Sequence, residues 1–135
     1  MKQGERYIIF VLFRNGQRKK QLTTGKQINV REKVLKNDEN ELVRHEAAFS
    51  LGQMCYSSGI APLADATLHD PSMFVRHEAA IALGVIGSKE AKQVLEKALD
   101  DPDKPVVESA VVALSNIQFM EKLSKNEKFA KLTGG

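Results

Sequence analysis

The chain has 135 residues, of which 42% are hydrophobic and 27% charged, values typical of a single soluble globular domain. No stretch reaches the roughly 18 consecutive apolar residues of a membrane-spanning helix. The single cysteine, Cys55, excludes an internal disulfide and a cysteine-based metal knuckle, so we expect a cytoplasmic protein.

The net charge of +3 is distributed unevenly along the chain. Residues 1–36 carry ten Lys or Arg against two Glu, whereas residues 37–135 carry ten against fifteen Asp or Glu. The basic block Arg18-Lys19-Lys20 could contact nucleic acid, but no aromatic interleaving or base-reading motif accompanies it. A solvated basic face is the favoured interpretation, and an acidic partner is a second possibility.

The first predicted element is an apolar helix at residues 6–13, which we interpret as a degenerate repeat followed by a loop from Lys19 to Gln27. No small-residue cleavage site follows it, so we predict no secretion signal.

A motif of six residues, Val-Arg-His-Glu-Ala-Ala, occurs at residues 43–48 and again at residues 75–80. The similarity extends over residues 43–55 and 75–87 at a spacing of 32, and a weaker copy follows 31 residues later at residues 106–117. Self-similarity at such a period indicates a stacked repeat array. We therefore predict an all-α, HEAT-like helical-repeat solenoid of about four helix pairs.

Within each copy the apolar residues recur at helical spacing, as with Val75, Ala79, Leu83 and Ile86, which predicts a buried helix face. The Asp70-Pro71 and Asp101-Pro102 steps predict helix starts with a capping Asp. We expect a second helix in each pair after a turn, at residues 60–69 and 89–99.

His69 is interpreted as a residue favoured by the dipole at a helix end. The repeat domain is predicted to cover residues 1–123. The polar segment 124–135 is predicted to be a frayed C-terminal tail.

The two copies place His45-Glu46 and His77-Glu78 at equivalent positions near the starts of neighbouring helices. Stacked helices lie about 8–10 Å apart, so both histidines could reach one ion. Adjacent helix positions point about 100° apart, so Glu46 and Glu78 should not face the ion from their own histidine's direction. Histidine and carboxylate without cysteine suits non-haem iron better than structural zinc.

An alternative without chemistry is that these residues form surface ion pairs with Arg44, Arg76 or Glu41. A lone pair would favour this alternative, whereas two identical pairs in register leave the alternatives nearly balanced. The third copy has Glu108-Ser109 in place of a pair, which confines any such site to two repeats.

The sequence resembles the deoxyhypusine hydroxylase family of HEAT-repeat di-iron monooxygenases. The resemblance covers roughly residues 5–120. It is carried by Glu-Arg-Tyr at residues 5–7, by the two His-Glu motifs with Leu-Gly-Gln-Met following the first, and by Val-Val-Glu-Ser at residues 106–109. Repeats of the phycobilisome-lyase type share the Val-Arg and Ala-Leu-Gly frame but do not require His-Glu.

The resemblance implies that His45 and His77 ligate iron, that Glu46 is a carboxylate ligand, and that Glu78 lies near the metal or the substrate amine. It also implies a catalytic role for both glutamates. The family enzyme has two such halves with four His-Glu pairs, whereas this chain supplies one half and two pairs. A two-fold homodimer would restore four pairs.

The leading hypothesis is a half-length monooxygenase acting on a deoxyhypusine-type side chain of a translation factor. An equal alternative is that the chain is a fragment of a longer protein. The alternative is a HEAT scaffold that binds another protein without catalysis. A third possibility, nucleic-acid binding through the basic N-terminal third, should weaken steeply with salt. The choice of iron over manganese or zinc is left open.

Overall fold

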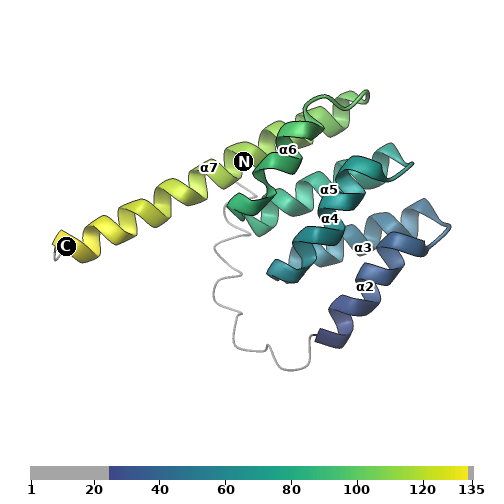
Figure 1. The fold of residues 1–135 in the computed structure, drawn as a ribbon, viewed down its shortest axis with the longest axis horizontal. Helices are drawn as coiled ribbons and strands as arrows, with labels where there is room; N and C mark the ends of the chain where they lie inside the picture. The colour runs from purple at the N-terminus through teal and green to yellow at the C-terminus, as the bar shows by residue number, and fades with distance from the viewer. Residues whose placement is uncertain (1–24, 134–135) are drawn as a thin grey trace, which may run out of the picture.

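The computed structural model describes residues 25–133, which form two layers of α-helices (Figure 1). Layer A contains α2 (Gly25–Asn37), α4 (Ile60–His69) and α6 (Lys92–Ala98). Layer B contains α3 (Glu41–Met54), α5 (Met73–Ile86) and α7 (Lys104–Thr133). Short 3-10 turns at Ser57–Gly59 and Lys89–Ala91 precede α4 and α6. The predicted all-α, HEAT-like solenoid is confirmed, and the predicted first repeat at residues 6–13 lies outside the described residues.

Each layer B helix packs against the layer A helix that precedes it in the chain. The pairs are α2 with α3, α4 with α5, and α6 with α7. Our prediction placed the motif helix first in each pair, and this was wrong, because short connections such as residues 38–40 and 70–72 fold the preceding helix back onto it. Helix α2 is not among the predicted elements, and its first three residues fall in the predicted loop from Lys19 to Gln27.

The core lies between the two layers and between neighbouring repeats. Val75, Ala79 and Leu83 are fully buried, as their helical spacing predicted, and Ile86 packs against the same core. Burying one such large apolar side chain contributes about 1.5–3 kcal/mol, so the stacked interfaces supply most of the stability. Other fully buried large side chains come from every repeat described: Leu51, Leu63, Leu95, Val106 and Ile117.

The Asp-Pro steps organise turns rather than cap helices, which corrects the predicted capping role of Asp70 and Asp101, although a helix does begin just upstream of each motif as predicted. Helix α5 begins at Met73 with Ser72 at the N-cap, and the Asp70 carboxylate accepts a hydrogen bond from the Ser72 N–H at 2.8 Å. Asp101 accepts equivalently from the Asp103 N–H at 2.9 Å. An Asp side chain bonding the backbone two residues on is the usual way it stabilises a turn.

The same two aspartates hold the arginine of each motif. Arg44 donates to both carboxylate oxygens of Asp70, at 2.9 and 3.0 Å, and to the backbone oxygens of Asp38 and Glu39. Arg76 makes the equivalent bonds to Asp101 and to the Asp70 backbone oxygen, and it also bonds the Asp103 carboxylate at 2.6 Å. We call these two arrangements the arginine clasps. Each ties a layer B helix to the turn that starts the next one.

Helix α7 continues through the segment that we expected to fray. It runs for 30 residues to Thr133, about 45 Å at 1.5 Å per residue, and its second half extends beyond the other helices (Figure 1). Residues 124–133 contain neither Gly nor Pro and are rich in Lys, Glu, Ala and Leu, which favour helix. Among residues 25–133, no helix combines the length and the apolar character that crossing a bilayer requires.

Two glycines permit the close stacking of layer B. A Cβ atom built on Gly52 would lie 2.7 Å from the Ala82 Cβ atom, and one on Gly84 would lie 2.7 Å from both the Cα and the Cβ atoms of Ala113. These distances are far below van der Waals contact. The small residues predicted to allow close helix approach therefore do so.

We predict that Gly84→Ala destabilises the protein, because the added methyl meets backbone that cannot move aside. Overpacking costs about 1–3 kcal/mol, which exceeds the gain of up to about 1 kcal/mol from replacing a helical glycine. Chemical denaturation of the variant measures the difference. Gly59→Ala is the matched control, because its Cβ would meet atoms no nearer than 3.8 Å. Equal midpoints for the two variants would contradict the tight packing.

We predict that Arg44→Lys lowers the free energy of unfolding by about 1–3 kcal/mol, because an ammonium group cannot satisfy Asp70 and two backbone oxygens from one position. The side chains of Arg44 and Asp70 are only 10% and 6% exposed. Lys104→Ala, which breaks the exposed Lys104–Glu108 pair, serves as control and should change stability by less than about 0.5 kcal/mol. Thermal unfolding of both variants tests this difference.

Candidate functional site

The four predicted site residues lie near the N-terminal ends of two neighbouring layer B helices, as expected. His45 and Glu46 are on α3, and His77 and Glu78 are at the equivalent positions of α5. The arginine immediately before each histidine is fixed by its clasp. This fixes the rotation of each helix about its axis, and with it the direction in which the next residue points.

The histidine of the first repeat contacts the glutamate of the second. His45 Nε2 lies 3.2 Å from Glu78 Oε2, and its other nitrogen, Nδ1, lies 3.6 Å from Glu46 Oε1. The Glu46 side chain is 74% exposed and the Glu78 side chain only 11%. Equivalent glutamates therefore have different surroundings, because α3 covers Glu78 while Glu46 faces solvent.

Burial raises the pKa of Glu78 above the ordinary value of a glutamate, because desolvation disfavours its charged form. The Glu46 carboxylate raises this pKa further, whereas His45 and His77 lower it. Glu78 is thus a buried carboxyl group whose anion requires a nearby positive charge for stabilisation.

The histidine of the second repeat has different partners. His77 Nδ1 lies 2.6 Å from the Ser109 hydroxyl oxygen and 3.2 Å from the Pro105 backbone oxygen. Ser109 is the third repeat's counterpart of Glu78. Each histidine therefore reaches one repeat forward along layer B, to the side chain at the glutamate position of the next helix.

The structure groups His45 with Glu46 and Glu78 and places His77 against α7. Within residues 25–133, no hydrogen bond joins the two histidines, and no group of three or more His, Cys, Asp or Glu side chains is arranged to hold a metal ion. The predicted convergence of both histidines on one ion stays a prediction. The surface ion pairs of the alternative are not seen at the arginines, which bind the turn aspartates, nor at Glu41, which accepts from Ser72.

Ser109 and Pro105 were not predicted as site residues. The sequence showed Glu108-Ser109 only as a departure from the motif. Ser109 could be predicted only by assuming that each histidine contacts the residue at the glutamate position of the next repeat. Distances between side chains of neighbouring helices cannot be read from the sequence, so this pairing is seen only in the structure. His69 does end α4, as predicted.

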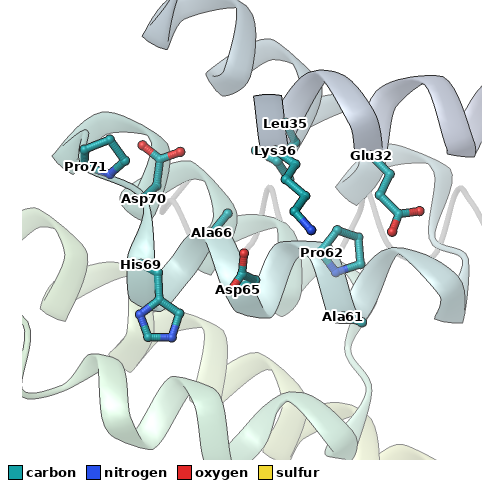
Figure 2. Close-up of a pocket in the computed structure, with 10 residues that line it drawn as sticks. All are labelled: Glu32, Leu35, Lys36, Ala61, Pro62, Asp65, Ala66, His69, Asp70 and Pro71. Atoms are coloured by element: carbon teal, nitrogen blue, oxygen red, sulfur yellow. The ribbon is translucent and has the colours of Figure 1, made fainter. Parts of the chain in front are cut away.

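A separate cavity of about 380 Å³ lies on the layer A side, between α2 and α4 (Figure 2). None of the four predicted site residues lines it. Its walls carry charges of both signs and a few apolar groups: Glu32, Leu35, Lys36, Ala61, Pro62, Asp65, Ala66, His69, Asp70 and Pro71. Because its lining shares no residue with the His-Glu site, this cavity is a separate feature of the structure. Its Asp70 is the aspartate that binds Arg44 in the first clasp.

Comparisons with known proteins agree with this architecture. A family model described as HEAT repeats matches residues 28–115. Deoxyhypusine hydroxylase from Schizosaccharomyces pombe is 39% identical over 93 residues, covering 67% of this chain and 29% of that protein. The enzyme of the same name from Dictyostelium discoideum is 44% identical over 86 residues, covering 63% of this chain and 27% of that protein.

The structure of human deoxyhypusine hydroxylase in complex with glycerol superposes with a TM-score of 0.67 at 31% identity. The match covers 72% of this chain and 34% of the human one. This chain thus matches only about a quarter to a third of the length of these relatives. Over that part it belongs to the HEAT-repeat family, and its resemblance to the deoxyhypusine hydroxylases is confirmed.

Proposed function

We propose that this chain is one half of a deoxyhypusine hydroxylase-like, non-haem iron monooxygenase that becomes complete when it pairs with a second copy. The observation that carries the proposal is the row of His45, Glu78 and His77 along two adjacent helices, in a chain similar to proteins of that name. The substrate would be a deoxyhypusine-type side chain on a translation factor.

The donor atoms suit iron in kind. Imidazole nitrogen and carboxylate oxygen are the ligands of non-haem iron sites, and no thiolate accompanies them in the row. Glu78 adds a second point of support, because a bound cation would stabilise the anion that burial disfavours. His45, His77 and Glu46 would be the other ligands. Bound iron would supply the oxygen activation that side chains cannot perform.

The number of metal-ligating groups in one chain supports pairing with a second copy. Within one chain His45 already contacts Glu78, whereas His77 Nδ1 is paired with Ser109 and Pro105 and Glu46 is largely exposed. A two-fold dimer offers the same patch from both copies, so the exposed groups of one copy can complete those of the other. We propose catalytic roles for Glu46 and Glu78 in this pair, because the exposed Glu46 suits the cationic amine of a substrate and Glu78 lies beside His45.

A non-catalytic scaffold is the second candidate, and a surface feature favours it. Layer B exposes apolar side chains at Leu42, Phe49, Phe74, Val111 and Val112, each at least 44% exposed. Exposed apolar groups of this kind can mark a protein-binding surface. A protein substrate would use the same surface, so metal content rather than protein binding separates the two candidates. For either, we keep the cytoplasm as the expected compartment.

We predict that the untagged protein, reconstituted anaerobically with Fe²⁺, holds about one iron per chain and is a dimer. His45→Ala and His77→Ala should each lose most of this iron without unfolding, because each removes a nitrogen ligand. Elemental analysis combined with light scattering measures both quantities. His69→Ala, at the far end of a layer A helix, is the matched control and should keep its iron.

A metal-free monomer that takes up no iron would contradict the proposal and leave the scaffold. Stoichiometric manganese or zinc in place of iron would contradict the oxygen chemistry while keeping the metal site. Dimer formation without metal would favour an assembly role.

We predict that metal-free Glu78→Gln is more stable than the wild type at neutral pH. Because the folded pKa of Glu78 is raised, its carboxyl binds protons more tightly in the native than in the unfolded state. Its contribution to stability is therefore present at low pH and lost as pH rises from the ordinary glutamate range through the raised pKa. The advantage of the variant should accordingly shrink as pH falls. Denaturation midpoints across a pH series test this, with the exposed Glu46→Gln as control.

A further inference from the structure

Ser109 is the least expected neighbour of the His-Glu row. It is 6% exposed on α7, and its hydroxyl donates to the Pro105 backbone oxygen at 2.8 Å. The same hydroxyl oxygen lies 2.6 Å from His77 Nδ1, which is itself 3.2 Å from the Pro105 oxygen. The three atoms are therefore within hydrogen-bond distance of one another. At most two protons can lie between them, one from the serine hydroxyl and one on Nδ1.

The triangle allows only one favourable arrangement of protons when His77 is neutral. The Pro105 oxygen can only accept, and the serine hydroxyl has one proton to give. If that proton pointed to Nδ1, the bare Nδ1 and the Pro105 oxygen would be two acceptors facing each other at 3.2 Å. If it points to Pro105, Nδ1 carries a proton, donates to the Ser109 oxygen and is attracted to both oxygens.

We propose that Ser109 is a positioning residue that keeps the proton of neutral His77 on Nδ1 and so presents the Nε2 electron pair for a metal ion. The contacts found for His77 within residues 25–133 are both at Nδ1, so no described residue takes up the Nε2 electron pair. The hydrogen bond at one ring nitrogen of a histidine sets the role of the other. The identification of the ligand as a metal rests on the proposed function, whereas the position of the proton does not.

The two histidines of the repeated motif are thereby different. His45 has a carboxylate near each of its nitrogens, Glu46 at Nδ1 and Glu78 at Nε2. His77 has a fixed Nδ1–H and an open Nε2 because its partner from the following repeat is a serine instead of a glutamate. The departure of the third repeat from the motif is thus a functional element of the second.

Nitrogen NMR of histidine tests the proposal directly. Metal-free protein labelled with ¹⁵N-histidine is recorded at about pH 8.5, some two units above the ordinary histidine pKa of about 6.5, using long-range ¹H–¹⁵N correlation. Protonated and bare ring nitrogens have well-separated shifts, and the chain has only His45, His69 and His77 to assign. We expect a protonated Nδ1 at His77. A protonated Nε2 in the wild type would overturn the proposal without any variant being needed.

Three substitutions on α7 extend the test. Ser109→Ala removes the nearer of the two acceptors of the Nδ1 proton and leaves the Pro105 oxygen, so it should raise the population of the other His77 tautomer without abolishing Nδ1–H, and weaken Fe²⁺ binding by up to about 10-fold. Ser109→Thr, which keeps a hydroxyl, should restore both properties. Ser115→Ala, at an exposed serine of the same helix, should change neither.

An unchanged tautomer in Ser109→Ala would also overturn the proposal, and so would unchanged iron affinity in a variant whose tautomer has shifted. If the wild type takes up no iron, the proposed function fails, and the tautomer spectrum still decides the role of Ser109. The two failures are therefore distinguishable.

Discussion

The register between repeats depends on the arginine clasps, and the site depends on that register. Each clasp is built from a planar guanidinium group that binds a turn aspartate in a bidentate manner and also satisfies backbone oxygens, a geometry that lysine cannot reproduce. Asp70 connects two clasps, because its carboxylate accepts from Arg44 while its backbone oxygen accepts from Arg76. The histidine follows the clasped arginine in the chain, so its direction is set by a contact that it does not make itself.

Identical motifs acquire different chemistry from what lies one repeat ahead. His45 and His77 have the same sequence neighbours, yet His45 contacts a buried carboxylate and His77 a hydroxyl. The difference originates about 32 residues downstream, where glutamate is followed by serine in the next copy. A repeat array can thus diversify a site by changing one residue of a neighbouring repeat, without altering the helix that carries the histidine.

The sequence was sufficient for the fold and the location of the site, but not for its contacts. Periodicity identified the layer B helices and their buried faces, because the spacing of Val75, Ala79 and Leu83 has only one helical interpretation. Helix α2 escaped notice because it lacks the motif and exposes much of its surface. The Asp-Pro steps were misassigned because capping and turn formation use the same residue, and only the position of Ser72 distinguishes them.

The unequal burial of Glu46 and Glu78 follows from their different positions among the described helices. Glu78 is covered by the preceding helix α3, whereas α3 is the first layer B helix of the described residues, and its own glutamate is left 74% exposed. In the next helix, His77 has its Nδ1 atom beside the Ser109 hydroxyl. Among the described residues, Glu46 thus contacts His45 at 3.6 Å while staying largely exposed, and the Nδ1 atom of His77 is paired with a hydroxyl rather than a carboxylate. An exposed carboxylate and an imidazole are complementary groups, so under the proposed pairing a second copy related by two-fold symmetry would present one to the other with the same surface.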